Sequence, residues 1–438
     1  MQTIDLILEA DWIVPVEPAD TLFHHHAVII DKGKIIDLLP VDQIHHQYHA
    51  LEHQRYPGHV LMPGFVNAHT HAAMNLLRGL ADDLPLMTWL ERHIWPAEAS
   101  HVSEEFVEDG TRLAIAEMIR SGTTCFNDMY FYADVAAKVA QQAGIRAVVG
   151  LIVLEFPTLW AANADEYINK GLAVNDQLKD ADLITTAFAP HAPYTVADES
   201  LRHIQVLANE LDLGIHMHIH ETADEITESL KRHQLRPLQR LQQLDMLTPN
   251  LQAVHMTQLL PDEIELIAST GVHVVHCPES NLKLASGFTP VANLLQAGVN
   301  VALGTDGAAS NNDLDMISEM RTAALLAKGV ANDASAVNAM QSITMATLNG
   351  ARALGLDDYT GSLLPGKSAD IIAIDLNNIE TQPVYHADSH LVYSCSRDQV
   401  TDVWVAGHQL MRNRELTGLD QKEILEKARY WQQRINQS

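Results

Sequence analysis

The stretch VLMPGFVNAHTH at residues 60–71 decides the fold. Its first part, residues 60–66, is a short apolar run that predicts a buried β-strand. His69 and His71 follow directly, and side chains two residues apart on an extended chain project to the same side. Both imidazoles can therefore bind one metal ion. An isolated pair of this kind also occurs as polar loop residues, but in parallel α/β barrels the active-site residues lie at the C-terminal ends of strands.

Seven more apolar runs follow along the chain and alternate with longer helical patterns, as parallel βαβ units require. These runs are residues 123–128, 147–154, 183–188, 213–218, 251–255, 272–276 and 299–304. Eight parallel strands with intervening helices fit a closed barrel better than an open sheet. We therefore predict an α/β fold, a (β/α)8 barrel of the TIM type, over residues 60–360.

The two ends of the chain have a different pattern. Short alternating strands are expected at residues 4–14, 27–39, 369–376 and 400–411, and residues 421–438 have the pattern of an amphipathic helix. We predict a small β-sandwich formed from both termini. Residues 1–59 and 361–438 are its two parts, and the barrel is inserted between them.

Composition narrows the classes of function. The 438 residues, 47% hydrophobic and 19% charged, are enough for one large barrel and a smaller unit. A formal net charge of −28 repels phosphate backbones, which argues against nucleic acid and favours a small-molecule ligand. No apolar run approaches the roughly 20 residues of a membrane span. No lysine or arginine precedes Lys32, so a secretory signal is not expected and a cytoplasmic location is. The three cysteines are too widely spaced for a thiolate zinc knuckle.

Polar side chains recur at further strand ends. The fifth run ends in HMHIHE at residues 216–221, and the eighth ends in GTDG at residues 304–307. The sixth ends at His255, and the fourth is followed by His191. Because the C-terminal ends of barrel strands meet at one face, polar residues at five of them predict a metal site. The residues alone leave open which histidine of the fifth run binds the metal: His216, His218 or His220.

Nitrogen and oxygen ligands without thiolate suit Zn²⁺, with Fe²⁺ or Mn²⁺ as substitutes. A bound metal lowers the pKa of its water toward about 7 and makes hydroxide available at neutral pH. Asp306 can accept the proton of that water. Glu221 can pass a proton to a ring nitrogen of the substrate and then to leaving ammonia.

Several motifs together resemble one known family. They are PGFVNAHTH at residues 63–71, His218-x-x-Glu221 and GTDG at residues 304–307. The combination resembles the amidohydrolase superfamily, and most closely the 5-methylthioadenosine/S-adenosylhomocysteine deaminases. The resemblance extends over nearly the whole chain, including residues 76–79, 188–194, 280–284 and 361–370. It implies zinc-dependent hydrolytic deamination of the adenine ring of 5′-methylthioadenosine to 5′-methylthioinosine and ammonia, with S-adenosylhomocysteine or adenosine as further substrates.

The resemblance also implies roles for individual residues. By this resemblance, the metal ligands are His69, His71, His218 and Asp306. It makes Glu221 and His255 the catalytic pair beside the metal, with His255 orienting the attacking hydroxide without being a ligand. The binuclear branch of the superfamily bridges two metals with a modified lysine on the fourth strand. Residues 183–188 contain no lysine, so one Zn²⁺ per subunit is expected.

Substrate contacts carry over by the same resemblance. Glu98, in WPAE at residues 95–98, matches the glutamate that binds ribose, and His191 matches a contact to the purine nucleoside. Without the resemblance, Glu98 fits a surface carboxylate beside a helix equally well. We also expect Trp89 and Ser310 to contact the substrate, together with Glu221 and Asp306.

Two other interpretations use the same residues. One is another mononuclear amidohydrolase, such as a guanine or oxidised-purine deaminase or a triazine chlorohydrolase; Glu98 favours the nucleoside. The other is a catalytically silent barrel scaffold, which would be expected to have lost ligands, whereas all four are present here. Relatives with the sandwich domain commonly associate, so we expect a homo-oligomer.

The segment after the third barrel strand bears on the 5′ substituent of the substrate. Relatives that accept S-adenosylhomocysteine hold its carboxylate with arginines there, but no arginine occurs between Leu151 and Asp182. The segment instead offers four residues suited to an uncharged thioether: Phe156, Pro157, Leu159 and Trp160. We therefore predict a preference for 5′-methylthioadenosine. Lys170, Lys179 or an arginine from a neighbouring subunit are the alternative sources of positive charge.

Overall fold

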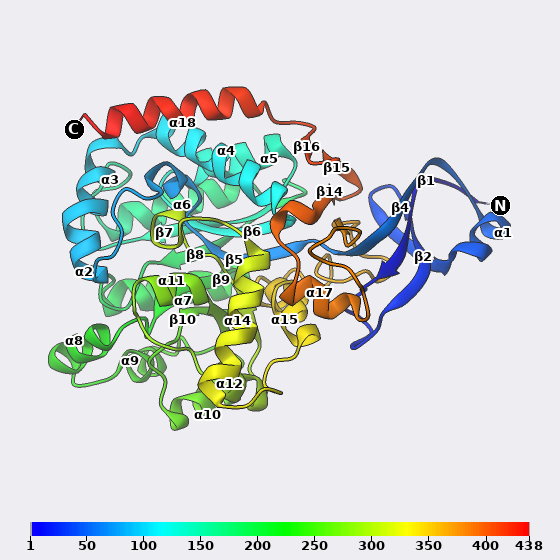
Figure 1. The fold of residues 1–438 in the computed structure, drawn as a ribbon. Coiled ribbons are helices and arrows are strands. Elements are labelled where there is room, and N and C mark those ends of the chain that lie inside the picture. Colours follow the sequence, from blue (N-terminus) through cyan, green and yellow to red (C-terminus); the bar gives the residue numbers. More distant parts are fainter. Residues whose placement is uncertain (1, 438) are drawn as a thin grey trace.

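The structure is a computed structural model, and it describes residues 2–437. Eight parallel strands run in sequence order from β5 to β12 within one sheet, with helices between them (Figure 1). The strands are β5 Phe65–Thr70, β6 Thr123–Tyr130, β7 Arg146–Val153, β8 Ile184–Pro190, β9 Gly214–Ile219, β10 Leu251–His255, β11 His273–His276 and β12 Val301–Leu303. The predicted (β/α)8 barrel is confirmed.

Helices alternate with the barrel strands along the chain. Between β5 and β6 lie η2 Ala72–Leu77, α2 Leu86–Trp89, the π-helical turn η3 Leu90–Ile94, α3 Trp95–His101 and α4 Glu104–Arg120. Then follow α5 Ala133–Ala143, α6 Ala164–Gln177, α7 Asp198–Leu211, α8 Ala223–His233, α9 Pro237–Gln243, α10 Pro261–Thr270, α11 Pro278–Lys283 and α12 Val291–Gln296. After β12 come α13 Ala308–Asn311, α14 Met316–Ala331, α15 Ala339–Met345 and α16 Leu348–Ala353.

The seam between the first and last barrel strands is closed by side chains and turns. The Asn67 amide donates to Thr305 Oγ1 at 2.7 Å, and its oxygen accepts from the Thr305 N–H at 3.0 Å. The Asp306 N–H donates to the His69 carbonyl at 3.0 Å. Gly304 permits this approach, because a Cβ at that position would lie 2.8 Å from the His69 Cβ. The seam therefore joins the two strands that carry His69 and Asp306.

The predicted first strand, residues 60–66, has the wrong limits. Residues up to Pro63 belong to β4 Tyr48–Pro63, which pairs with β13 Ile371–Asp375 in the terminal sheet, whereas β5 begins at Phe65. Gly64 joins the two strands, and a Cβ there would lie 2.1 Å from the Thr124 Cγ2. Both strands are buried at this point, so the apolar pattern continues across the junction and does not mark it.

Strands from both termini form one β unit, as predicted, and they pair in a single mixed sheet (Figure 1). Its strand order is β16-β15-β14-β13-β4-β1-β2-β3, and β1 and β4 are parallel. The remaining strands are β1 Gln2–Ile13, β2 Phe23–Asp31, β3 Lys34–Pro40, β14 Val400–Val405, β15 His408–Arg412 and β16 Glu415–Leu416. Short helical segments accompany them: η1 Val41–Gln43, α1 Ile44–Gln47, α17 Ala387–Tyr393 and η4 Arg397–Gln399. Leu8 and Ile30 share one apolar cluster with Ile371 and Trp404, so the single sheet encloses its own core. The division of the chain at residues 59 and 360 stays a prediction.

The two units are tied together at several points. The Arg146 guanidinium, on β7, forms a buried ion pair with Asp370 at 2.9 Å. The terminal helix α18 Gln421–Ile435 runs along α4 (Figure 1). There the Trp431 ring packs against Phe106, and its Nε1–H donates to Asp109 at 2.9 Å. Within residues 2–437, no helix combines the length and apolar character needed to cross a membrane.

Candidate active site

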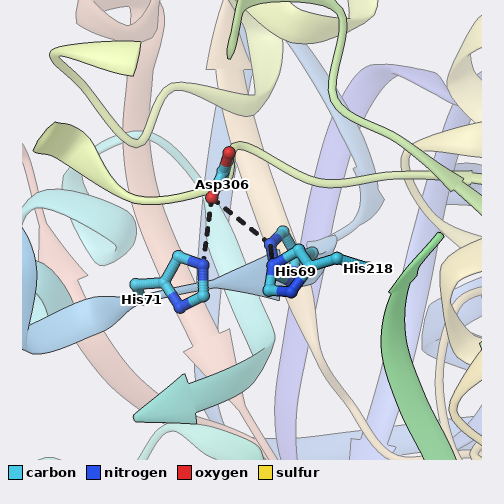
Figure 2. Close-up of side chains that lie close together, drawn as sticks. All are labelled: His69, His71, His218 and Asp306. Atoms are coloured by element: carbon cyan, nitrogen blue, oxygen red, sulfur yellow. Dashed lines mark hydrogen bonds and ion pairs between the residues drawn. The ribbon is translucent and has the colours of Figure 1, made fainter. Parts of the chain in front are cut away.

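Three histidines and one aspartate come together at the C-terminal ends of the barrel strands: His69, His71, His218 and Asp306 (Figure 2). One ligand atom from each lies within 4.8 Å of all the others. The Asp306 Oδ1 is 3.2 Å from His71 Nε2 and 3.3 Å from His69 Nε2. The His69 and His218 Nε2 atoms are 3.2 Å apart. Two ligands of a tetrahedral Zn²⁺ at about 2.0–2.1 Å are separated by about 3.3 Å, so this spacing fits one ion.

The opposite ring nitrogens of the three histidines are all held. His71 Nδ1 lies 2.6 Å from the Met129 carbonyl oxygen, and His218 Nδ1 lies 2.7 Å from the His191 carbonyl oxygen. His69 Nδ1 lies 2.9 Å from His216 Nε2. A carbonyl oxygen can only accept, so it places the proton of His71 and of His218 on Nδ1 and leaves their Nε2 lone pairs free for a metal. The Nε2 atoms of all three histidines face one point.

Asp306 sits in a strained backbone conformation at the end of β12, with a φ of 62°. Its Oδ1 accepts from the Gly307 N–H at 2.8 Å, and its Oδ2 accepts from the Ser280 hydroxyl at 2.6 Å. Burial opposes ionisation, but the hydrogen bonds to His69 and His71 hold the pKa of this carboxyl well below its usual value. Asp306 is therefore a fixed carboxylate.

Glu221 and His255 lie next to this group. The Glu221 Oε2 is 3.9 Å from His255 Nε2, and its Oε1 accepts from the Ser286 hydroxyl at 3.3 Å. Burial raises the pKa of Glu221 above its ordinary value. His255 Nδ1 lies 2.8 Å from the Asn281 Oδ1, which orients the ring with Nε2 toward Glu221. The pair thus combines a carboxyl that can hold a proton with an oriented imidazole.

Glu98 lies on α3, beyond the π-helical turn. The Tyr130 hydroxyl, at the end of β6, donates to its Oε1 at 2.7 Å. Burial raises the pKa of Glu98 to about 7, while the Tyr130 hydrogen bond and nearby His71 act in the opposite direction. Glu98 is therefore not an exposed surface carboxylate but an acceptor directed toward the cavity described below.

His191 lies after β8, with its ring 4.8 Å from the His218 ring, centroid to centroid. Its Nδ1 is 3.1 Å from the Thr195 hydroxyl. Burial lowers the pKa of His191 to about 3, so its imidazole is neutral at physiological pH. A neutral ring can donate one hydrogen bond and accept another.

These side chains surround one cavity of about 460 Å³, within the usual range for small-molecule sites. Every predicted site residue except the fully buried His69 lines it, including Trp89 and Ser310. Away from the histidines its wall is largely apolar, with Trp95, Phe156 and Trp160 among its aromatic residues. None of the lining residues is a lysine or an arginine.

The other histidines of the fifth run point elsewhere. The His216 Nε2 contacts His69 Nδ1, the ring nitrogen turned away from the other ligands, and the His220 ring accepts from the Leu238 N–H at 3.2 Å. The sequence prediction gave no role to Tyr130, Ser286 or the His191 carbonyl. It quoted Ser280 and Asn281 only as part of a motif. The signal that could have found Tyr130 is its position: it is a polar residue at the end of a barrel strand, like the residues predicted at five other strand ends.

The comparisons with known proteins agree with this site. A model described as the Amidohydrolase family matches residues 60–410. The chain belongs to the amidohydrolase family. It is 52% identical to a 5-methylthioadenosine/S-adenosylhomocysteine deaminase of Teredinibacter turnerae, over 99% of this chain and 98% of that protein. The identity to the protein of the same name from Saccharophagus degradans is 53%, over 98% and 97%.

A solved structure is also similar along the whole chain. It is an adenosine deaminase of Xanthomonas campestris with bound zinc, 52% identical, with a TM-score of 0.99 and full coverage of both chains. Within the amidohydrolase family, this chain groups with the 5-methylthioadenosine/S-adenosylhomocysteine deaminases, as the motifs predicted. It is a metal-dependent hydrolase of C–N bonds.

Proposed function

We propose that the enzyme hydrolytically deaminates the adenine ring of 5′-methylthioadenosine, using one Zn²⁺ per subunit. One observation carries the proposal: a single cavity is lined by three of the four metal-binding residues and Glu221, together with the ribose-binding candidate Glu98. A purine nucleoside needs a metal site with a proton donor at its reacting carbon and a hydrogen-bond acceptor at its ribose hydroxyls, because these groups lie at different ends of the molecule.

The metal-binding group supports zinc. Three imidazole nitrogens and one carboxylate oxygen form a ligand set that Zn²⁺ accepts, and Fe²⁺ or Mn²⁺ are substitutes that the same atoms could hold. Strand β8 contains no lysine to bridge a second ion. Bound there, zinc supplies the Lewis acidity that makes water a nucleophile at neutral pH.

The protein side chains then move the protons. The Asp306 carboxylate accepts a proton from the attacking water while a C–O bond forms at the ring carbon that carries the amino group. Glu221 donates its proton to the neighbouring ring nitrogen, takes up the hydroxyl proton of the resulting intermediate and passes it to the amino group, so that the C–N bond breaks and ammonia leaves. The proton held by Asp306 then returns to Glu221, so that one water is consumed, one ammonia is released and both carboxyls regain their starting state. His255, fixed by Asn281, orients the attacking oxygen.

The remaining predicted contacts hold the substrate. The Glu98 carboxylate accepts hydrogen bonds from the ribose hydroxyls, and neutral His191 contacts the purine. Trp89 and Ser310 line the cavity beside them, and the Ser310 hydroxyl is 3.1 Å from that of Ser280.

The wall around the 5′ substituent favours a thioether. Phe156, Leu159 and Trp160 line the cavity. Lys170 is outside the lining: its Nζ donates to the Trp160 carbonyl and pairs with Glu166 at 2.9 Å. Lys179 pairs with Asp176 at 2.6 Å and is also outside it. An amino-acid carboxylate would therefore find no lysine or arginine among the described residues that line the cavity.

The test is kcat/KM for 5′-methylthioadenosine and S-adenosylhomocysteine in one buffer. A missing charge-assisted contact is worth roughly 1.5–3 kcal/mol, so we expect a preference of about tenfold or more for 5′-methylthioadenosine. Equal or reversed values would show that the carboxylate has a partner, for example an arginine from another subunit.

A wider screen separates the other interpretations. Ammonia release is followed with adenosine, guanine and an aminotriazine as well, and chloride release with a chlorotriazine. Activity confined to the non-nucleosides would contradict the role of Glu98, and a zinc-loaded chain inactive on all of them would favour a silent scaffold. A homo-oligomer and a cytoplasmic location remain predictions of this proposal, and light scattering of the purified enzyme tests the first.

A further inference from the structure

The supports of the three ligand histidines differ in kind. His71 and His218 are each held at Nδ1 by a backbone carbonyl, which always accepts. His69 is held by the imidazole of His216, whose Nε2 is 2.9 Å away. An imidazole nitrogen can either donate or accept, so the proton position of His69 depends on that of His216.

The chemistry of the site selects one arrangement. To bind a metal through Nε2, neutral His69 must carry its proton on Nδ1, and this proton needs an acceptor. His216 Nε2 can accept it only when the His216 proton is on Nδ1. His216 is fully buried, and its Nδ1 has no hydrogen-bond partner among residues 2–437. A buried donor without a partner is costly, and its retention here is explained by what the other nitrogen does.

We propose that His216 is a positioning residue for the metal: it fixes the tautomer and ring orientation of His69 so that His69 Nε2 can act as a ligand. This inference rests on the zinc site of the proposed function. His216 is also the one support of the three that a substitution can remove, since the other two are main-chain carbonyls.

Substitutions at His216 separate hydrogen bonding from packing. The amide of glutamine lies near the position of Nε2 and can accept from His69, whereas the shorter amide of asparagine lies near Nδ1 and cannot reach. Leucine fills much of the space without any acceptor. His276 is another buried histidine at a barrel strand end, and neither of its ring nitrogens has a hydrogen-bond partner within the part of the chain that the structure describes. The matched control is therefore His276→Leu.

The experiment measures the zinc dissociation constant of the full chain by competition with a chromophoric chelator. Loss of such a support typically weakens metal binding by about 10–100-fold. We expect that weakening for His216→Leu and His216→Asn, and near wild-type affinity for His216→Gln and His276→Leu. Circular dichroism verifies folding, and if His216→Leu does not fold, the comparison of His216→Asn with His216→Gln is sufficient.

Three results would overturn the inference: unchanged affinity in His216→Leu and His216→Asn, equal weakening in His216→Gln, or equal weakening in His276→Leu. The last two would indicate a packing effect. A wild-type chain that binds no zinc contradicts the proposed function itself, so the two failures are distinguishable.

Discussion

Replacing Tyr130 by phenylalanine removes one hydroxyl from the site and leaves the ring in place. That hydroxyl donates to the Glu98 Oε1 at 2.7 Å. Burial raises the pKa of Glu98 to about 7, and the Tyr130 hydrogen bond limits the rise. Without it, the pKa of Glu98 moves further up. At a given pH a smaller fraction of Glu98 is then the carboxylate that accepts from the ribose hydroxyls.

The size of the effect follows from the contact. A hydrogen bond to a charged acceptor contributes roughly 1.5–3 kcal/mol, and about 1.4 kcal/mol corresponds to one pH unit, which sets a ceiling of about one to two units. Because the protonated carboxyl can still exchange a hydrogen bond with Tyr130, we expect an upward move of about one unit. Below the pKa of Glu98, kcat/KM should then fall about tenfold relative to wild type.

The assay is the pH profile of kcat/KM for 5′-methylthioadenosine, which reports ionisations of the free enzyme and substrate. The acidic limb of Tyr130→Phe should lie at higher pH than that of wild type, with zinc content unchanged. The control substrate is 2′,3′-dideoxyadenosine, which lacks the 2′- and 3′-hydroxyls that Glu98 would bind and should show no such difference. Superimposable profiles for 5′-methylthioadenosine, or the same displacement with the dideoxy substrate, would refute this reasoning.

Three further outcomes are expected. His218→Ala should lose tight zinc binding and activity together, because a protein ligand is removed; full occupancy by elemental analysis would contradict the ligand assignment. Glu221→Gln should keep zinc while turnover falls about 10²-fold or more, since an amide cannot shuttle a proton, and near wild-type turnover would remove Glu221 from the mechanism. Arg146→Met leaves the buried carboxylate of Asp370 unpaired and should lower the free energy of unfolding by about 3–5 kcal/mol in urea titrations. The double variant Arg146→Met/Asp370→Leu should recover much of that loss, and no recovery would argue against the ion pair as the cause.

The repetition of apolar runs made the barrel predictable. Strands β6, β9 and β10, for example, are buried almost throughout, and polar side chains gather where the runs end because parallel strands finish at one face. Local pattern could not locate the junction at Gly64, since the end of β4 and the whole of β5 are continuously buried although they belong to different sheets. A boundary between sheets is set by pairing partners that lie far away in the sequence.

The metal-binding group was partly predictable from spacing. Identical parity made His216, His218 and His220 equal candidates, and the resemblance selected His218. In the structure, His218 Nε2 lies 3.2 Å from His69 Nε2, whereas His216 Nε2 faces the opposite nitrogen of the His69 ring. Glu98 was assigned by resemblance alone, because its burial depends on a π-helical turn and on Tyr130 from another strand. Contacts between distant segments leave no periodic trace in the sequence.

The seam of the barrel has a consequence for how the enzyme responds to metal. Asn67 and Thr305, which close it, are 238 residues apart in the chain, and no ladder of main-chain hydrogen bonds joins β5 to β12 among the described residues. The metal-binding group draws His69 and His71 from one side of this seam and Asp306 from the other. A metal ion bound by these residues would cross-link the first and last strands of the barrel, β5 and β12. The cross-link reduces the entropy that is lost when the long chain segment between them is ordered. Removing the metal should therefore accelerate amide hydrogen exchange first in β5 and β12, because the zinc-free protein would open locally between these two strands.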